Sequence, residues 1–415
     1  ALDKNPEKRK ESVMNRNRFS KWLALLSAGV LLFSLTGCSP STQPADTQPE
    51  SSLSEESQPA VPDPVSVSFV SVGDNLIHSS IYQQANARAG GGDNYDFSAA
   101  YANVADRIAQ PDVATINQET VMSGMDEPSS YPLFNSPQTL GDQMIALGFD
   151  VFNLANNHML DMGSDGLDAT LQYWDSKTEV VHTGAYRNPE EFYQVESHTV
   201  NGLKIGYVGA TSYTNGLSLP DGSQLTYILT SEEDLLKAKI EAARAVCDVV
   251  VVNVHWGNEY ATEPTQEQRD LAQKMLNWGA DVILGHHPHV LQTMEYLPKY
   301  DGEQGLVIYS LGNFISAQDQ GMRMIGGMLN YTLTKHYDTN TVTVDNVSFE
   351  PVITHYDSGY KNIRLYLYSQ YSNDLALAHG VRSNTSSFSM EYIDQVVSGV
   401  IPEQFWKPAA SQQAA

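Results

Sequence analysis

Apolar, strand-like runs alternate with helix-like segments from about residue 65 onward, and this alternation constrains the fold more than any other feature. Such alternation is typical of βαβ units, which assemble a parallel or mixed sheet. The run at residues 248–254 is almost wholly apolar, as expected of a strand that is covered on both faces. The pattern predicts strands at residues 65–72, 112–116, 149–154, 203–210, 248–254, 281–284 and 306–310, and helices at residues 97–109, 137–147, 163–174, 231–246 and 264–278. Further on it predicts a β hairpin at residues 326–334 and 341–351, then mainly helices over residues 360–400.

Polar side chains follow the carboxyl ends of five of these predicted strands. They are Asp74; Asn117 with Glu119; Asn156, Asn157 and His158; His255; and His286, His287 and His289. Open α/β sheets place ligands at this edge. Carboxylate, amide and imidazole groups together suit Zn, Mn, Fe or Mg, so the pattern favours a metal site.

Each cluster also has an ordinary structural interpretation. Asp74 could cap a turn, Glu119 could be a solvated loop acid, and the adjacent asparagines could occupy a turn with positive φ. His255 could stack in the core. Three histidines within residues 286–289 are harder to explain in this way, because His-rich tracts commonly bind metal.

The charge of the chain restricts its partners. The formal net charge is −25 over 415 residues. This argues against a nucleic-acid partner, because binding a polyanion relies on Lys and Arg. An acidic polymer would be repelled as well, unless metals or a local basic patch offset the charge.

The amino terminus has the pattern of a secretory leader. Basic residues between Met14 and Lys21 precede an apolar run at residues 22–35, and the run ends in Leu-Thr-Gly-Cys38. This ending resembles a bacterial lipobox, which implies a lipid on Cys38 and an extracytoplasmic, membrane-anchored protein. A plain secreted protein and an uncleaved anchor helix are the alternatives.

The expected organisation follows from this pattern. It consists of a leader at residues 1–38, a Ser- and Pro-rich tether at residues 39–64, a domain at residues 65–400 and a tail at residues 401–415. Residues 1–13 are set aside as an extension ahead of a credible start at Met14.

The ordered clusters carry a family resemblance. The motifs are Gly73-Asp74, Asn117-x-Glu119, Asn156-Asn157-His158, His255-Trp256-Gly257-Asn258-Glu259-Tyr260, Gly285-His286-His287-Pro288-His289-Val290 and Ser310-Leu311-Gly312-Asn313-Phe314. Together they resemble the CapA family, named for poly-gamma-glutamate capsule synthesis and related to calcineurin-like metallophosphoesterases, over about residues 65–380. The chain departs from that pattern at Gln118, where Leu is usual, at His78, where many members have Arg, and at Leu76, where a DxH motif would have histidine.

The resemblance implies an α/β fold, a four-layer αββα metallophosphoesterase-like sandwich with two divalent metal ions (Mn, Zn, Fe or Mg) at the sheet edge. The implied metal ligands are Asp74, Glu119, Asn157, His255, His287 and His289. His158 is implied as the proton donor, and Asp161, three residues on, could orient it. Residues expected to contact substrate or to support the ligands are His78, Asn117, Asn156, Trp256, Glu259, His286 and Asn313.

The implied function is hydrolysis of a phosphoester or a related cell-envelope substrate, linked to capsule synthesis or export. The expected partners are an anionic envelope polymer or phosphoester, and membrane proteins of capsule synthesis. The alternative is a non-catalytic component of an export or attachment machine, in which the metals shape a binding surface. Hydrolysis of an amide bond is a third interpretation.

Overall fold

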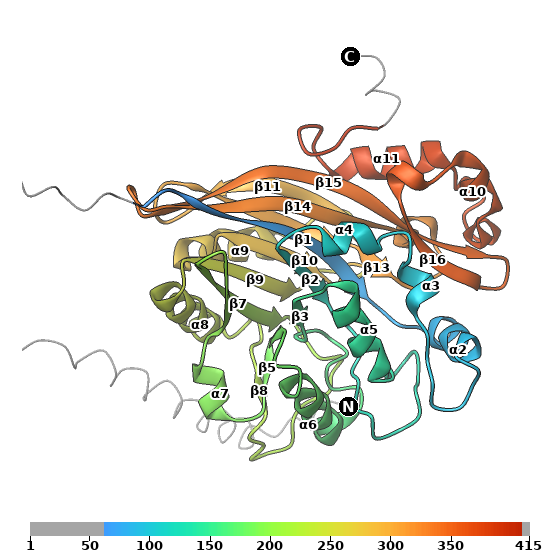
Figure 1. The fold of residues 1–415 in the computed structure, drawn as a ribbon, viewed down its shortest axis with the longest axis horizontal. Helices are drawn as coiled ribbons and strands as arrows, with labels where there is room; N and C mark the ends of the chain where they lie inside the picture. The colour runs from blue at the N-terminus through green and yellow to red at the C-terminus, as the bar shows by residue number, and fades with distance from the viewer. Residues whose placement is uncertain (1–61, 409–415) are drawn as a thin grey trace, which may run out of the picture. The chain divides into compact units, whose positions relative to one another are not determined.

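Two facing β-sheets form the centre of the structure, and helices cover their outer faces (Figure 1). The computed structural model describes residues 62–408. The expected leader and Cys38 lie outside the described residues. Within the described residues, the structure contains no helix that is both long enough and apolar enough to cross a membrane.

The first sheet has eight strands, and its central strand is β1. Strands β1 to β4 run parallel to one another, whereas β14, β15 and β16 follow on the other side of β1 in antiparallel order. The short strand β13 pairs with the end of β1. The strands are β1 (Val65–Asn75), β2 (Val113–Asn117), β3 (Val151–Asn153), β4 (Val181–Thr183), β13 (Asn313–Ile315), β14 (Ile325–His336), β15 (Thr341–Asp357) and β16 (Lys361–Leu367).

The second sheet has six strands in the order β11-β12-β10-β9-β7-β6. Its four inner strands are parallel, and the two edge strands are antiparallel to their neighbours. The strands are β6 (Glu196–Val200), β7 (Leu203–Thr211), β9 (Val249–His255), β10 (Val282–His286), β11 (Leu291–Pro298) and β12 (Gln304–Leu311). A separate two-stranded sheet pairs β5 (Ala185–Tyr186) with β8 (Thr226–Tyr227).

The helices complete a four-layer α/β/β/α arrangement, which confirms the expected fold class. On the first-sheet side lie α2 (Ser79–Arg88), α3 (Ser98–Tyr101), α4 (Ala105–Ala109), α5 (Thr139–Leu147) and α6 (Gly163–Asp175), and on the second-sheet side α7 (Pro189–Tyr193), α8 (Glu233–Val246) and α9 (Gln266–Trp278) (Figure 1). The carboxyl-terminal part holds η1 (Gly321–Met324), η2 (Tyr368–Gln370), α10 (Asn373–Ala378), η3 (Gly380–Ser383) and α11 (Met390–Val400).

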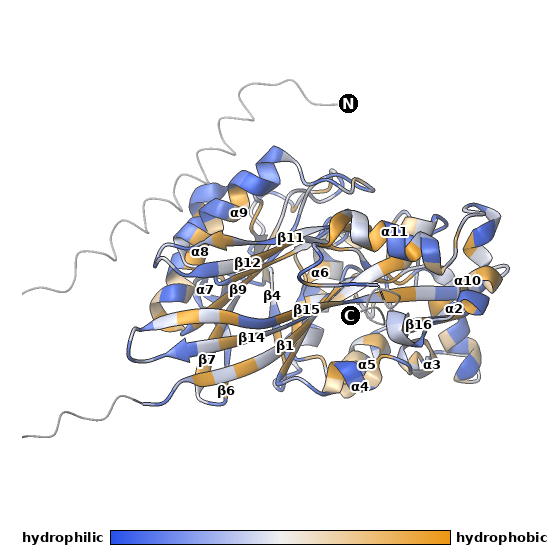
Figure 2. Cartoon of the chain, turned by 90° about the horizontal axis from the view of Figure 1, so that it is seen from above, coloured by the Kyte–Doolittle hydropathy of each residue, from blue (hydrophilic) through white to orange (hydrophobic). Residues whose placement is uncertain are grey.

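Strand β9 shows why these layers form. Its valines are fully buried and alternate between two cores: Val249 and Val251 pack between the sheets, whereas Val250 and Val252 pack against α8 and α9. Burying each side chain contributes roughly 1.5–3 kcal/mol. The helices are amphipathic, so that apolar sides face the sheets and polar sides face outward (Figure 2).

The sequence predicted most of the central elements but did not predict α2, β4, β6 or β11. Two of its predictions also differ from the structure. The single helix expected at residues 97–109 is broken into α3 and α4. The mainly helical pattern expected over residues 360–400 begins with a strand, β16, in which Ile363, Leu365 and Leu367 are buried on alternate positions. Strand β16 pairs with β15, so the alternation of buried and exposed residues in this segment was the pattern that predicted its structure correctly.

The packed core also continues beyond the boundary expected at residue 400. Ile401, Phe405 and Trp406 are all buried within the main core. The backbone N–H of Phe349 on β15 donates to the carbonyl oxygen of Phe405 at 3.0 Å. The segment expected as the start of a tail therefore belongs to the domain.

Candidate metal centre

The carboxyl ends of strands from both sheets meet at one edge of the structure. Strands β1, β2 and β3 are neighbours in the first sheet, and β9 and β10 are neighbours in the second. The two groups bring together the side chains of Asp74, Glu119, Asn157, His255, His287 and His289, each at most 2% exposed. The six residues predicted as metal ligands are therefore buried at one site.

A close backbone contact fixes the position of Asp74. The N–H of Asp74 donates to the carbonyl oxygen of Gly312 at 2.9 Å, and Asp74 pairs with Asn313 on β13. A Cβ atom on Gly73 would lie 1.8 Å from that same oxygen. Glycine at position 73 is therefore required for β1 to approach the turn at Gly312.

Asp74 is ionised by the arrangement around it. Its Oδ1 accepts from Asn117 Nδ2 at 2.8 Å, and its Oδ2 lies 3.1 Å from His289 Nδ1. Burial opposes the charged form, but the nearby imidazole of His286, the hydrogen bond from His289 and the charge of His289 outweigh it. They hold the pKa of Asp74 well below its usual range.

The surroundings of Glu119 shift its pKa in the opposite direction. Its Oε1 lies 3.6 Å from both His255 Nε2 and His289 Nε2, and neither carboxylate oxygen has a hydrogen-bond partner within the described structure. Burial, followed by the charge of Asp74, raises the pKa of Glu119 well above its usual value. Two buried carboxylates side by side, one of them with both oxygens unsatisfied, fit a divalent cation, because a bound positive charge would offset their mutual repulsion and the cost of burying them.

Among residues 62–408, two sets of three side chains have the spacing of metal ligands. One is Asp74, Glu119 and His289, and the other is Glu259, His287 and His289; within each set one ligand atom per residue lies within 4.8 Å of the others. His289 belongs to both. Glu259, expected as a supporting residue, is thus placed as a candidate ligand, and it is exposed.

Asn157 and His255 extend this arrangement. Asn157 Oδ1 lies 2.9 Å from His255 Nε2, which is itself 3.1 Å from His287 Nδ1. Burial and the neighbouring His287 lower the pKa of His255 well below its usual range, and burial with His289 lowers that of His287 to about 3. Neutral imidazoles are the form that binds metal.

The histidine loop has an unusual backbone. His287 and His289 both have positive φ, at 98° and 58°. Such conformations cost about 1–3 kcal/mol each and persist where the surroundings impose them, commonly at functional sites. The loop directs His289 Nδ1 toward Asp74 and Asn313, at 3.1 and 3.0 Å. Despite its burial, His289 has its pKa raised to about 9 by the charge of Glu119 and by Asp74.

His158 and Asp161 form a pair beside the ligands. His158 Nδ1 lies 2.7 Å from Asp161 Oδ2, which also accepts from the backbone N–H of Phe134 at 2.7 Å. A carboxylate can only accept, so Nδ1 carries the proton and Nε2 is left for other partners. The ring of Phe134 packs edge-on against His158 and His78, with centroids 4.8 and 5.3 Å apart.

The predicted supporting residues mostly hold the ligands in place. Asn156 accepts from the N–H of His158 at 3.0 Å and donates to the carbonyl of Gln118 at 3.0 Å. Asn117 and Asn313 contact Asp74 and His289, and His286 Nδ1 lies 3.6 Å from Asp74 Oδ1. His78 accepts from the N–H of Ala317 at 3.2 Å at the rim.

Trp256 is a correction. It is 2% exposed and belongs to the core between the second sheet and helices α8 and α9. Its indole N–H donates to the carbonyl of Tyr309 at 2.9 Å, and its ring stacks on the ring of Tyr309. Trp256 follows His255 directly, and successive side chains point to opposite faces, so it has a packing role instead.

Two residues that follow β7 reach the site but were not predicted from the sequence. The Tyr213 hydroxyl contacts the imidazole of His287. Asn215 Oδ1 accepts from Asn157 Nδ2 at 3.2 Å, and Asn215 Nδ2 lies 3.4 Å from His158 Nδ1. Both lie just past the strand predicted at residues 203–210. The rule that located the other clusters would have found them.

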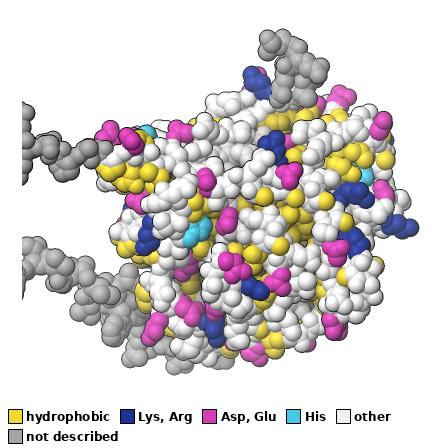
Figure 3. All heavy atoms as spheres, viewed as in Figure 1, with side chains coloured by type: hydrophobic (Ala, Val, Ile, Leu, Met, Phe, Trp, Pro, Cys, Tyr) yellow, Lys and Arg dark blue, Asp and Glu magenta, His cyan; other side chains and the backbone are white. Residues whose placement is uncertain are grey.

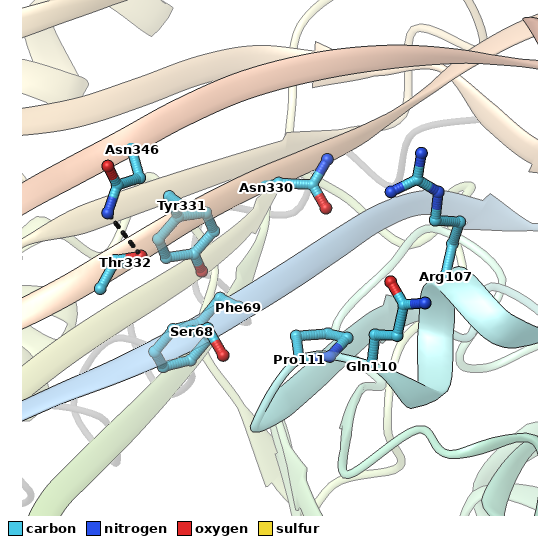
Figure 4. A pocket seen from close by; sticks show the side chains of 9 residues that line it. All are labelled: Ser68, Phe69, Arg107, Gln110, Pro111, Asn330, Tyr331, Thr332 and Asn346. Carbon is cyan, nitrogen blue, oxygen red and sulfur yellow. Dashed lines mark hydrogen bonds between the residues drawn. The ribbon is translucent and has the colours of Figure 1, made fainter. Parts of the chain in front are cut away.

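The structure also has a pocket away from the candidate metal centre. A pocket of about 270 Å³ on the first sheet is lined by residues that include Ser68, Arg107 and Tyr331 (Figure 4). Ser68 precedes Asp74 by six residues on β1, a separation of roughly 20 Å along a strand. This pocket is therefore distinct from the candidate ligands.

Two sheets whose strand ends gather carboxylates, histidines and an asparagine define an α/β protein with a candidate divalent-metal site. The family described as bacterial capsule synthesis protein PGA_cap matches residues 68–318, which is more than half of the chain. The chain belongs to this family, as the resemblance predicted.

Curated relatives agree with this assignment. The chain is 34% identical over 203 residues to the capsule biosynthesis protein CapA of Bacillus anthracis, a match that covers 48% of this chain and 47% of the relative. It is also 34% identical over 191 residues to the PGA biosynthesis protein CapA of Bacillus subtilis, covering 46% and 48%. The chain thus spans about half the length of these relatives.

Solved structures resemble the domain more distantly. A phosphatase from Mycoplasma pneumoniae is 13% identical with a TM-score of 0.43, covering 70% of this chain and 94% of that one. A 5'-nucleotidase from Candida albicans is 12% identical with a TM-score of 0.39, covering 68% and 51%. At these TM-scores the similarities do not bear on activity.

Proposed function

We propose that this protein is a metal-dependent hydrolase of a phosphoester or related cell-envelope substrate in capsule synthesis or export. One observation carries the proposal. The buried set Asp74, Glu119 and His289, in which both carboxylate oxygens of Glu119 are unsatisfied, lies beside a hydrogen-bonded His158–Asp161 pair. A site of this composition combines ligands for a cation with a group that can transfer a proton.

The residues that would hold metal divide between two positions that share His289. Asp74 and Glu119 would serve one, and His287, His255, Asn157 and Glu259 the other. Divalent ions there, of which two are proposed, would polarise a bound phosphoryl oxygen and lower the pKa of water. Mn, Zn, Fe and Mg all accept these ligand types.

His158 is the proposed proton donor. Its Nδ1–H is directed at Asp161, so Nε2 is the nitrogen available to a leaving oxygen. Asp161 fixes the ring orientation and stabilises the protonated imidazole, as a carboxylate beside a catalytic histidine does. The ring of Phe134 covers one side of His158 and limits access of water there.

We further propose that a lipid on Cys38 anchors the protein at the outer face of the membrane. The start of the folded domain and the candidate metal centre lie at opposite ends of β1. The strand begins at Val65, and Asp74 is nine residues further along, roughly 30 Å away. A tether joined at Val65 would leave the site facing away from its attachment. This arrangement suits a soluble or polymeric anionic substrate in the cell envelope.

Metal content of the purified protein is the first test. Mass spectrometry should find about two equivalents of a transition metal, lost in His287→Ala combined with His289→Ala. The control His336→Ala removes a histidine on β14 that contacts Thr343 and should keep its metal. Hydrolysis of a chromogenic phosphodiester should follow the metal. Metal-free wild-type protein after purification without chelators would contradict the proposal.

A scaffold role is the second candidate, and position 76 favours it. Leu76 is 2% exposed and stands where a DxH motif would provide another imidazole. The variant His158→Ala separates the two functions. Catalysis predicts loss of turnover and of capsule with metal content unchanged, whereas a scaffold predicts normal capsule.

A further inference from the structure

An arginine lies beside the candidate metal centre. Arg323 is in η1, in the segment that follows β13. Its carbonyl oxygen accepts from Asn313 Nδ2 at 3.0 Å, and Asn313 Oδ1 lies 3.0 Å from His289 Nδ1. The backbone of Arg323 is therefore fixed to a neighbour of a candidate ligand.

The side chain of Arg323 stacks on Tyr260. The guanidinium carbon is 3.5 Å from the centre of the Tyr260 ring, and that ring is 6.1 Å from the ring of His289. Tyr260 has a positive φ of 64°, and its N–H donates to the carbonyl of Pro288 at 2.7 Å. The ring that supports the guanidinium is thus held by the histidine loop itself.

Stacking leaves the edge of the guanidinium available. An arginine has five N–H donors in one plane, and contact through its face uses none of them. Within residues 62–408, its one ion pair is a 3.5 Å contact between Nη1 and Asp319 Oδ1, a carboxylate whose side chain is 46% exposed. By contrast, Arg187 pairs with both Asp168 and Asp175, at 3.0 and 3.4 Å.

The negative charge around the site would make a positive side chain useful for binding an anion. Asp74, Glu119 and Glu259 all lie at the candidate ligand sets, in a chain with a net charge of −25. An anionic substrate approaching this edge would be repelled unless positive groups offset that charge. On the face shown in Figure 3, acidic and basic side chains are interspersed, so the surface there offers no broad basic field.

We infer that Arg323, held flat on Tyr260, binds an oxyanion of the substrate, either phosphate or carboxylate, beside the metal centre. The planar fork of donors matches both groups. The inference rests on the proposed function for the identity of the substrate. The binding of an anion by Arg323 can be measured independently of turnover.

The test measures binding of inorganic phosphate and of a short γ-linked glutamate oligomer by calorimetry, with the protein saturated with Mn²⁺ and again without metal. Arg323→Gln should weaken binding of the preferred anion about tenfold or more, and Arg323→Lys should weaken it less. The matched control Arg107→Gln removes the same charge from α4, where Arg107 pairs with Glu350, and should bind like wild type. Metal content should be equal in all four proteins.

The outcomes are separable. A loss confined to phosphate identifies a phosphoryl subsite, and a loss confined to the oligomer identifies a carboxylate subsite. Equal binding by wild type and Arg323→Gln overturns the inference, even if the enzyme hydrolyses phosphodiesters. Normal anion binding through Arg323 in a protein without turnover would retain the subsite and reject the hydrolase.

Discussion

The hydrogen bond between His158 and Asp161 makes a specific prediction about catalysis. Asp161 Oδ2 accepts from both the N–H of Phe134 and His158 Nδ1, so the amide oxygen of Asp161→Asn can take that position and keep both bonds, but without the negative charge. A neutral amide is a weaker acceptor than a carboxylate, so it holds the His158 ring less firmly. We expect kcat to fall roughly 10–100-fold, the range typical for residues that orient another, with little change in KM.

Metal content and a matched control check the cause of that loss. Asp161→Asn should retain its metal, because Asp161 contacts His158 and the backbone of Phe134 and belongs to neither candidate ligand set. Asp165→Asn, in the first turn of α6, removes the same charge and should behave like wild type. An unchanged kcat in Asp161→Asn would exclude an orienting role.

Single residues show how far the sequence could define the site. The clusters at the strand ends located the ligands because each parallel strand places the residues that follow it at the same edge of the sheet, even where the loops differ in conformation. The pattern did not show that Glu259, placed by its motif as a supporting residue, shares a ligand set with His287 and His289. The loop carrying Arg323 also has no periodic signal, and its side chain reaches the site only through the folded chain, whereas Tyr213 lies just past β7, where the strand-end rule applies.

At the scale of secondary-structure elements, strand β1 requires a glycine, Gly73, near its carboxyl end. Gly73→Ala would place a methyl group within 1.8 Å of the Gly312 oxygen, and the backbone would have to separate there. We expect a loss of roughly 2–4 kcal/mol in the free energy of unfolding and weaker metal binding, since Asp74 is the next residue. Chemical denaturation and metal titration measure the two effects.

A second glycine provides a control for which we expect the opposite change in the free energy of unfolding. Gly399 is in helix α11, and a Cβ atom there would meet no other atom within 4 Å. Gly399→Ala should therefore stabilise the domain, by about 0.5–1 kcal/mol, because alanine loses less backbone entropy in a helix. If both substitutions changed stability in the same direction, the close approach at Gly73 would not be the cause.

The length of an element partly decided whether the sequence revealed it, although α2 and β11 are long and were not predicted. Long strands such as β1 and β9 and helices such as α9 were predicted because each spans several periods of its pattern. Strands β5 and β8 have two residues each and β13 has three, which is too short for any period to appear. They form because tertiary neighbours offer hydrogen-bond partners.

At the scale of the whole domain, the site depends on how the two sheets face each other. Asp74, Glu119 and Asn157 come from the first sheet, and His255, His287 and His289 come from the second. The sequence predicted the central strands of both sheets but not the relative placement of the sheets, which is set by the shared core. Contacts that join the sheets far from the ligands therefore help to define the centre.

The residues after α11 are such a contact. Phe405 is 6% exposed, its ring lies 5.6 Å from that of Tyr296 on β11, and its carbonyl bonds to Phe349 on β15. One side chain thus touches the second sheet while its backbone joins the first. Phe405→Ala should cost about 3 kcal/mol through the cavity it leaves, measured by thermal and chemical unfolding.

Glu403→Ala is the matched control, since the Glu403 side chain is 79% exposed and pairs with Lys407 at the surface. Surface pairs contribute at most about 1 kcal/mol, so this variant should unfold near wild type. If the sheets are joined here, metal affinity should fall in Phe405→Ala as well, because the two halves of the ligand set become less tightly placed. Unchanged stability in Phe405→Ala would instead restore the expected boundary at residue 400 and make the segment a tail.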